Sequence, residues 1–311
     1  MSWINRLVVA TLPLVPKPIV RKVSSRYIAG DTLGDAVEVI RDLQQQGVCA
    51  TMDILGEYIT HKELALNAVE HYIQALDRIK AENLDSNISV KLTQLGLELD
   101  FDFCLQNIRK VVEAAKAHEN FVRIDMEDSS CTTRTIEIYR RLRRDFDNVG
   151  LVLQAYLRRS MRDLRDLIDS GIRLNIRLCK GIYDEPRQIA YKDPAVINFN
   201  YVAMLTTMFE NGVYVGIATH DEKLVWHALQ LIEKYRLTRE QYEFQMLLGV
   251  DEELRRIIVA DGHRLRVYVP FGKFWYPYSL RRLKENPKIA GYIIQNFFRQ
   301  PIHKPSKAEH A

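Results

Sequence analysis

Short apolar runs alternate with longer amphipathic stretches along most of this chain, beginning near residue 47. Eight of the runs are rich in apolar and β-branched residues and have the length of strands. They lie at 48–55, 88–95, 121–127, 149–156, 172–181, 214–220, 242–248 and 265–272. The stretches between them place apolar residues three and four positions apart, which is the spacing of a helix with one buried face. Two such faces comprise Leu64, Val69, Ile73, Leu76 and Ile79, and Leu105, Ile108, Val112 and Ala115.

Eight strands that alternate with helices, with no break in composition, predict one parallel sheet covered by helices. Eight such units are the number that closes an α/β barrel of the (β/α)8 TIM type, which we expect to occupy residues 31–298. The alternative is an open doubly wound sheet, but the chain has no GxGxxG sequence to support it. We therefore predict a distorted barrel, in which the last helix lies over the barrel mouth.

The two ends of the chain differ from this repeating pattern. Residues 1–30 hold five basic residues and no acidic one, around an apolar run at 7–15 that is too short to cross a bilayer. This basic segment is expected to be helical, and three roles stay open for it: a surface helix, an amphipathic segment that contacts a membrane, or a targeting peptide. Residues 299–311 are polar and are expected to form a disordered tail.

The composition is that of an ordinary globular protein, with 47% hydrophobic and 27% charged residues in a chain of 311. The 44 basic and 40 acidic residues leave a net charge of +4. Because the basic residues are spread along the chain, they indicate no stripe for nucleic acid. The four cysteines are far apart and form no CxxC pair. This indicates free thiols in a reducing, cytoplasmic compartment and predicts no metal site. The shortness of the apolar run at 7–15 predicts no transmembrane segment.

Polar residues follow every apolar run, at the strand ends where (β/α)8 barrels place their catalytic groups. They are Asp53, Lys91, Asp125, Glu127, Gln154, Arg177, Lys180, Thr219, His220, Gln245 and Tyr268. Lys91 and Arg177 come directly after apolar strand residues, where an unpaired charge would be too costly. Asp125 is a candidate partner for either base, so the set predicts one site at the barrel mouth. His220 has no second ligand at a metal-binding spacing, and we expect it to donate a hydrogen bond.

The segment after the eighth strand places four polar residues on one face of a helix. Pro277 can occupy the first turn, where its missing N–H costs nothing. Tyr278, Arg281, Arg282 and Glu285 follow at i, i+3, i+4 and i+7, which share one face at roughly 100° per residue. Two adjacent guanidinium groups suit a carboxylate or a phosphate, with Glu285 holding Arg281 and Tyr278 packing against an apolar ligand. This face predicts a small zwitterionic substrate.

Several motifs match those of a known family and follow its order. They include SVKLTQLG at 89–96, RIDMED at 123–128, QAYLRR at 154–159, RLCKGIY at 177–183, ATHDE at 218–222, EFQMLLG at 243–249, and VYVPFG followed by WYPYSLRRLKENP. Over about residues 27–290 the chain resembles the proline dehydrogenases, in their single-function bacterial form. Cys179 and Ile182 depart from the RLVKGAY form usual in that family, and the bulkier Ile182 can alter the fit of the flavin.

The resemblance implies an FAD-dependent enzyme that oxidises L-proline to Δ1-pyrroline-5-carboxylate by hydride transfer to the flavin, the first step of proline catabolism. It implies quinone as the electron acceptor, which gives the basic N-terminal segment a role in peripheral contact with the inner face of the membrane. It implies catalytic roles for Asp125, lying near Lys91, and for Arg177, lying beside the flavin. Substrate contacts are implied for Lys91, Tyr183, Leu247, Tyr268, Tyr278, Arg281, Arg282 and Glu285. Flavin contacts are implied for Met126, Gln154, Arg177, Lys180, Gly181, Ile182, Thr219 and His220.

Two alternatives to a flavoenzyme stay open on the sequence alone. Lys91 and Lys180 are compatible with an aldolase that forms a Schiff base on a lysine, and the arginine pair with a barrel that binds a phosphate. A non-catalytic barrel that binds proline or a similar small ligand would use the same residues without turnover.

Overall fold

The computed structural model describes residues 17–285, with every side chain up to residue 280 except those of Pro18, Ile19, Lys22 and Val23. The basic segment 1–30 lies partly within this range, where it forms the helix α2 (Lys17–Ser24). The expected tail at 299–311 lies outside the described residues.

Within residues 17–285, eight parallel strands close into a barrel in the order of the sequence. The strands are β1 (Cys49–Ile54), β2 (Ser86–Val90), β3 (Val122–Ile124), β4 (Val149–Gln154), β5 (Asn175–Cys179), β6 (Tyr214–Ala218), β7 (Tyr242–Leu247) and β8 (Leu265–Phe271). Each predicted strand overlaps one of these. The predicted TIM-type barrel is confirmed, and the open sheet is wrong because β8 pairs with β1 along its length, from Cys49↔Arg266 to Ile54↔Phe271.

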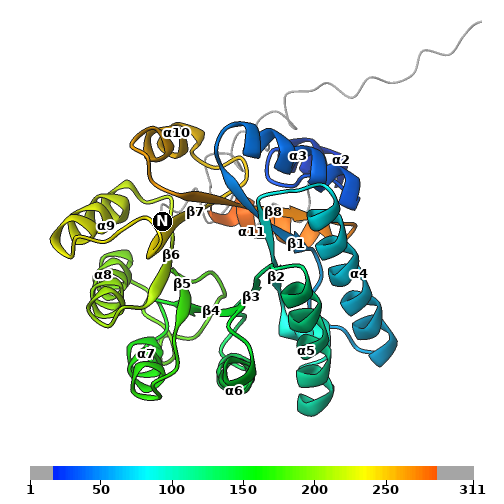
Figure 1. The fold of residues 1–311 in the computed structure, drawn as a ribbon, viewed down its shortest axis with the longest axis horizontal. Coiled ribbons are helices and arrows are strands. Elements are labelled where there is room, and N and C mark those ends of the chain that lie inside the picture. Colours follow the sequence, from blue (N-terminus) through cyan, green and yellow to red (C-terminus); the bar gives the residue numbers. More distant parts are fainter. Residues whose placement is uncertain (1–16, 286–311) are drawn as a thin grey trace, which may run out of the picture.

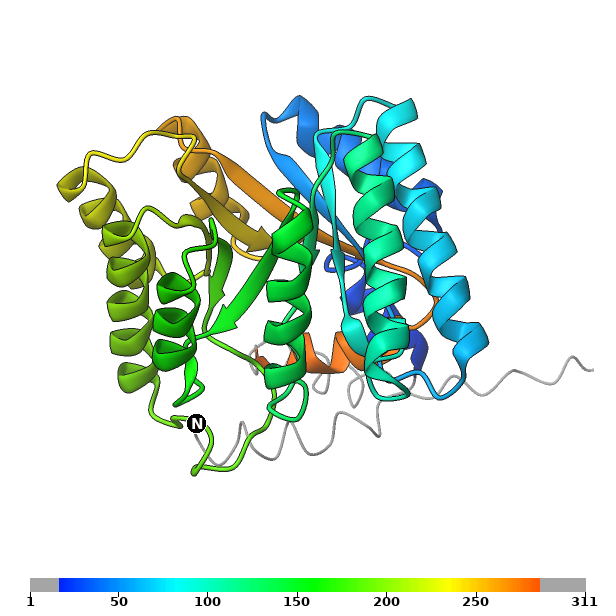
Figure 2. The same ribbon diagram turned by 60° about the horizontal axis from the view of Figure 1, so that its bottom comes forward.

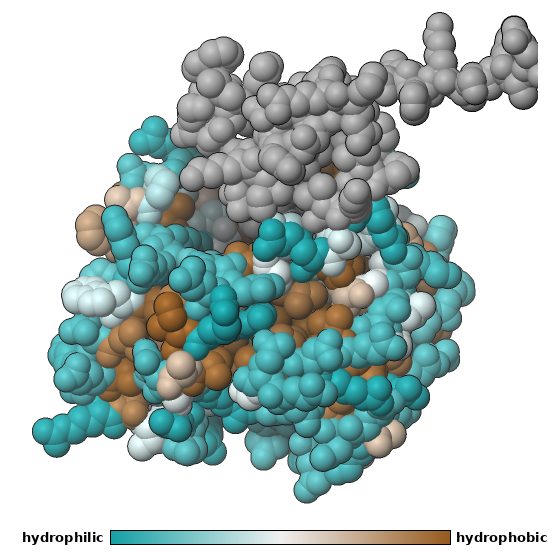
Figure 3. Space-filling view, turned by 90° about the horizontal axis from the view of Figure 1, so that it is seen from above, coloured by the Kyte–Doolittle hydropathy of each residue, from teal (hydrophilic) through white to brown (hydrophobic). Residues whose placement is uncertain are grey.

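A ring of helices surrounds the strands (Figure 1). The helices that follow strands β1 to β7 are α4 (Lys62–Ala81), α5 (Phe101–Ala117), α6 (Thr132–Asp145), α7 (Ser160–Asp169), α8 (Pro194–Glu210), α9 (Glu222–Lys234) and α10 (Glu252–Ala260). On the side seen in Figure 3, hydrophilic residues cover most of the surface and hydrophobic residues show in the gaps between them. One predicted core residue is exposed: Leu64, in the first turn of α4, faces a hollow at the barrel mouth rather than a strand.

The position beside β8 is taken by a helix from the other end of the sequence. Helix α3 (Leu33–Gln45) precedes β1 and packs on both β8 and β1. Helix α11 (Trp275–Glu285) follows β8, packs against α2 and lies across the end of the barrel (Figure 2). The predicted placement of the last helix over the mouth is therefore confirmed, with Pro277 in its first turn as expected.

The second strand is shorter than predicted. It ends at Val90, and residues 92–95 form a 3-10 turn, η2 (Leu92–Leu95), that ends at Gly96 with φ of +99°. The turn is held by the buried carboxylate of Glu127, which accepts hydrogen bonds from the N–H and the hydroxyl of Thr93. Gly96 suits this end because only glycine adopts a left-handed conformation without steric cost.

The two faces of the strands differ in chemistry. Buried apolar residues such as Ile88, Leu151 and Val267 belong to the core shared with the helices. The alternate positions carry polar side chains that bond across the barrel, as where Arg177 of β5 donates to Ser89 of β2 at 3.3 Å. Because β2 and β5 are not neighbours, this contact crosses the interior. A polar network therefore fills space that such barrels usually fill with branched apolar side chains.

Leu76→Ala should lower the free energy of unfolding by about 2–5 kcal/mol, because it leaves a cavity between α4 and the strands. Leu66→Ala on the same helix should change it by less than about 1 kcal/mol, because Leu66 is 42% exposed whereas Leu76 is 0% exposed. Denaturant unfolding gives the free energy of unfolding of each variant, and the two variants carry the same Leu→Ala change on one helix. Equal losses would contradict the assignment of the helix face.

Candidate functional site

The C-terminal ends of the strands open into a cavity of about 810 Å³. Of the predicted site residues whose side chains the structure describes, all fourteen line this cavity. They are Lys91, Asp125, Met126, Gln154, Arg177, Lys180, Gly181, Ile182, Tyr183, Thr219, His220, Leu247, Tyr268 and Tyr278. The strand-end pattern and the helix after β8 thus meet in one place. A cavity of this size accommodates a cofactor and a small substrate together.

Three further predicted residues are Arg281, Arg282 and Glu285. Their backbone belongs to α11, but their side chains lie outside the described residues. Tyr278, one turn earlier on the same helix, is buried and packs with Tyr27, Ile28 and Leu55. The described part of α11 therefore joins the cavity wall.

Lys91 forms an ion pair that the sequence did not single out. Its Nζ donates to Oδ1 of Asp53 at 2.6 Å, and both side chains are buried. Burial works against the ammonium, but the carboxylates of Asp53 and Asp125 outweigh it and raise the pKa of Lys91. Burial also raises the pKa of Asp53, an effect that Lys91 opposes. Asp125 is therefore near Lys91 but is not its hydrogen-bond partner. Of the two bases for which it was a candidate partner, it pairs with Arg177.

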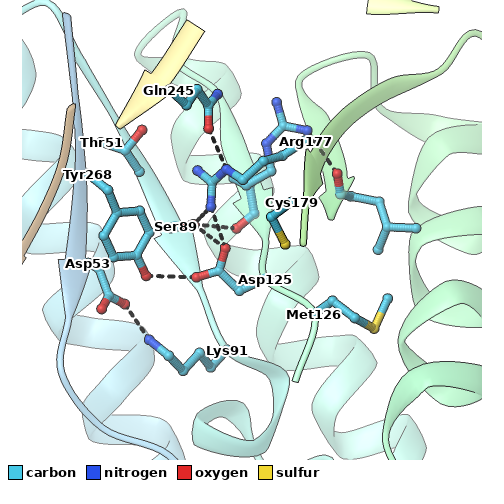
Figure 4. A network of polar contacts seen from close by, with 12 residues as sticks. Thr51, Asp53, Ser89, Lys91, Asp125, Met126, Arg177, Cys179, Gln245 and Tyr268 are labelled. Atoms are coloured by element: carbon cyan, nitrogen blue, oxygen red, sulfur yellow. Dashed lines mark hydrogen bonds and ion pairs between the residues drawn. The ribbon is translucent and has the colours of Figure 1, made fainter. Parts of the chain in front are cut away.

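Asp125 is instead the centre of a second cluster (Figure 4). Its Oδ1 accepts from Nη1 of Arg177 at 2.7 Å and from the hydroxyl of Ser89 at 2.7 Å. Its Oδ2 accepts from the hydroxyl of Tyr268 at 2.8 Å. The guanidinium of Arg177 also lies over the Tyr268 ring, 5.3 Å from its centroid. The cluster joins four strands at the cavity floor, and both oxygens of the partly buried carboxylate accept hydrogen bonds.

Gln154, in the cavity wall, offers a hydrogen-bond acceptor that has no partner among the described residues. Nε2 of Gln154 donates to the carbonyl of Met126 at 2.8 Å. Its Oε1 is buried and has no hydrogen-bond partner among the described residues. A buried amide oxygen in this condition costs about 1–3 kcal/mol unless a ligand N–H reaches it. The atom therefore suits a ligand or cofactor that presents an N–H to the cavity.

Gly181, in the same wall, lies close to the ring of Tyr156. Its φ is +104°, and a Cβ at this position would lie 2.0 Å from a ring carbon of Tyr156. Any larger residue would have to displace that ring or the backbone. Glycine at 181 thus keeps the chain after β5 flat against Tyr156 and leaves room above it for a ligand.

The contacts of the lysines and the histidine bear on two of the sequence expectations. Nζ of Lys180 donates to Oδ2 of Asp221 at 2.6 Å, so Lys180, like Lys91, lies in an ion pair. A Schiff base needs the neutral amine, and the aldolase hypothesis loses its motivation. Nε2 of His220 accepts from the N–H of Leu247 at 2.8 Å, so the hydrogen bond that we expect His220 to donate would come from Nδ1.

Several residues of the site were not assigned a role from the sequence. From the sequence, Asp53 and Gln245 are recognised only as polar strand ends, and Ser89 and Glu243 have no assigned role. Each occupies an inward position of its strand, two residues from another polar one. The two-residue alternation of polar and apolar positions is the signal that could have found them.

Within residues 17–285, no helix combines the length and the apolar composition that a membrane crossing requires. No group of three or more histidines, cysteines or acids in that range is arranged to hold a metal ion.

The chain is similar to known proteins over most of its length. The sequence model of the family described as Proline dehydrogenase matches residues 36–295. Proline dehydrogenase 1 of Bacillus subtilis subsp. natto is 35% identical over 275 residues, which cover 88% of this chain and 90% of that protein. Proline dehydrogenase of Deinococcus radiodurans is 33% identical over 281 residues, which cover 89% and 90%.

Among solved structures, similarity extends to larger proteins. The crystal structure of proline utilization A from Bdellovibrio bacteriovorus, inactivated by N-propargylglycine, superposes with a TM-score of 0.81 at 24% identity. The match covers 88% of this chain, which spans only 34% of that protein. This likeness shows the shared barrel fold.

Glu127→Gln should remove a pH-dependent loss of stability. Burial raises the pKa of Glu127 from its ordinary 4.5 to about 7, against the hydrogen bonds from Thr93. The folded protein thus keeps a proton that the unfolded chain has lost, so stability falls as the pH rises through this window. Between pH 4.5 and about pH 7, the free energy of unfolding of wild type should fall by about 3 kcal/mol relative to that of the variant.

The measurement is denaturant unfolding at several pH values. The amide of the variant can still accept from the N–H of Thr93 and donate to its hydroxyl oxygen. Glu253→Gln, at an exposed position of α10, is the matched control and should follow wild type. A slope for Glu127→Gln equal to that of the control would show that Glu127 is ionised in the folded protein.

Proposed function

The chain belongs to the proline dehydrogenase family, and from that premise we propose that it is a single-function, FAD-dependent enzyme that oxidises L-proline to Δ1-pyrroline-5-carboxylate. The observation that carries this proposal is the cavity itself. It has a buried ammonium and a buried arginine on its floor and an unbonded amide oxygen on its wall. A zwitterionic substrate beside a planar cofactor satisfies all three groups.

FAD supplies the hydride acceptor when it is bound. We assign its binding to the cavity wall formed by Met126, Gln154, Arg177, Lys180, Gly181, Ile182, Thr219 and His220. Gln154 would offer its free Oε1 to an N–H of the ring system. The cation of Arg177 lies on the cavity floor, where it would stabilise negative charge that develops on reduction.

Proline would bind with its carboxylate toward the cationic side of the cavity. The ammonium of Lys91 is held charged by Asp53 and is a suitable partner for a carboxylate. Arg281 and Arg282, buttressed by Glu285, are proposed to complete this clamp from α11. Leu247, Tyr183, Tyr268 and Tyr278 line the remaining space and would pack around the pyrrolidine ring.

The residues orient the reaction rather than exchange covalent bonds with the substrate. A hydride must leave the ring carbon next to nitrogen, and a proton must leave the nitrogen, as the C=N bond forms. Holding the ring against the acceptor removes most of the entropic cost of this step. Asp125 is proposed as catalytic in the sense that it fixes both Arg177 and Tyr268 at the reacting face.

The wider context follows from the same proposal. Electrons would pass from reduced FAD to quinone, with the protein in peripheral contact with the inner face of the membrane from the cytoplasm. The basic residues of α2 support such a contact, since Lys17 and Arg21 are exposed. We also propose a basic N-terminal segment at 1–30, a catalytic barrel at 31–298 and a tail at 299–311.

The proposed activity has a direct test. The purified protein should be yellow, and proline should bleach the flavin absorption under anaerobic conditions. Arg281→Met and Arg282→Met should each raise KM for proline by tenfold or more, because each removes a charged hydrogen bond of about 1.5–3 kcal/mol. Arg165→Met, at an exposed position of α7, is the control. Unchanged KM in both variants would refute the carboxylate clamp, and absence of bleaching would refute the activity.

Cofactor binding has a separate test at Gln154. Gln154→Leu removes the free acceptor in the cavity wall and should weaken FAD binding by about tenfold, the value of one hydrogen bond. Flavin release is measured by fluorescence during dialysis. Gln230→Leu on the exposed side of α9 should retain flavin as wild type does. Equal retention by the two variants would place the flavin elsewhere.

A further inference from the structure

We propose that Gln245 is a positioning residue that orients Arg177 in the cavity, with Glu243 and Arg266 as its anchor. The proposal rests on the function proposed above, in which Arg177 lies beside the flavin. The four side chains form one line of hydrogen bonds inside the barrel, reaching from Arg266 on β8 through Glu243 and Gln245 on β7 to Arg177 on β5.

Each link in this line is short and buried. Nε of Arg266 and Nε2 of Gln245 both donate to Oε1 of Glu243, at 2.8 and 2.6 Å. Nε of Arg177 donates to Oε1 of Gln245 at 2.5 Å. All four side chains are buried, with residue exposures of 3–7%. The four side chains are therefore shielded from solvent, and their orientations are set by the hydrogen bonds among them.

The charge on Glu243 fixes which way the amide of Gln245 points. Burial opposes ionisation, but the positive charge and hydrogen bond of Arg266 outweigh it and lower the pKa of Glu243 to about 2. An ionised carboxylate accepts hydrogen bonds and cannot donate them. The amide nitrogen of Gln245 must therefore face Glu243, and the amide oxygen is left for Arg177.

The neighbouring strand leaves the amide no room to turn. A Cβ added to Gly216 of β6 would lie 2.5 Å from Nε2 and 2.9 Å from Cδ of Gln245. Glycine at 216 thus provides the space in which the Gln245 amide packs. Gly216 has no left-handed φ, so an alanine there fits the backbone and acts by displacing the amide.

Arg177 is held at two points of its guanidinium. Gln245 fixes Nε, and Asp125 fixes Nη1 at 2.7 Å. Ser89 also accepts from Nη1, at 3.3 Å. Without Gln245 all the remaining hydrogen bonds of the guanidinium to described residues would be at Nη1, and the planar group could pivot about that atom. Gln245 fixes Nε without adding charge, so Asp125 is the one carboxylate within residues 17–285 that forms an ion pair with Arg177. The neutral amide therefore sets the direction of Arg177 while preserving its electrostatic effect.

The test uses two single variants that keep the net charge. Gln245→Met removes both hydrogen bonds of the amide, and Gly216→Ala displaces the amide but leaves it present. Both should slow anaerobic reduction of the flavin by proline about tenfold or more, because small misplacements at a reacting centre are costly. Both should leave KM for proline within about twofold. The midpoint potential of the bound flavin should become more negative, by about 30 mV for each tenfold loss in relative binding of the reduced form.

The double variant distinguishes positioning from general damage. If both changes act through the Gln245 amide, Gly216→Ala adds nothing in the Gln245→Met background, whereas independent defects add. Gln230→Met and Gly34→Ala are the matched controls, because Gln230 is exposed and a Cβ at Gly34 meets only Thr32 at 3.6 Å. Melting temperatures identify any variant that fails to fold. If Gln245→Met does not fold, the test rests on Gly216→Ala alone.

The inference is overturned if Gln245→Met keeps the wild-type reduction rate and potential, or if the two changes are additive in the double variant. It is also overturned if the folded single variants raise KM and leave the rate unchanged, since that would place Gln245 in substrate binding. A wild-type protein that binds no flavin or is not bleached by proline refutes the proposed function itself. The two failures are therefore distinguishable.

Discussion

Inside the barrel, Asp125 of the β3 end accepts hydrogen bonds from Ser89 of β2, Arg177 of β5 and Tyr268 of β8. The partners come from three strands spread around the ring, so the contacts exist only when the barrel is closed. Removing one partner of a buried ion pair costs about 3–5 kcal/mol, because the other charge is left without compensation. Closure of the sheet and assembly of the site are consequently one event.

This arrangement divides the barrel into two layers. Apolar side chains on the outward positions pack against the helices and provide most of the favourable burial. The inward positions hold Arg123, Arg266, Glu243 and the groups of the cavity floor. The placement of α11 across the end of the barrel fits the same division. Helix α3 packs on β8 and β1 and so occupies the position that a helix after β8 would take. The last helix, α11, lies across the end of the barrel instead, where Tyr278 lines the cavity.

The eight strands, the barrel and the position of the last helix could be predicted from sequence, because all follow from local periodicity and order along the chain. Eight of the fourteen predicted cavity residues could be found because strand ends converge in any such barrel. Tyr278 followed from helical spacing, and the other five were implied only by the resemblance to the family. The pairings could not. Whether Lys91 meets Asp53 or Asp125 depends on register and on side-chain direction across the interior. The turn after Val90 depends on Glu127, a residue more than thirty positions away, and the accepting role of His220 depends on where the Leu247 N–H points.

The interior network also explains how a single cavity can hold groups with different charge states before any ligand arrives. Asp53 and Asp125 raise the pKa of Lys91, Arg266 and its neighbours lower that of Glu243, and burial raises that of Glu127. These environments are set by residues on other strands, so they are fixed once the barrel is formed. The direction of Arg177 is fixed in the same way, through a neutral amide that is itself oriented by a buried charge. A cavity with charges and donors already in place needs little reorganisation when negative charge develops within it.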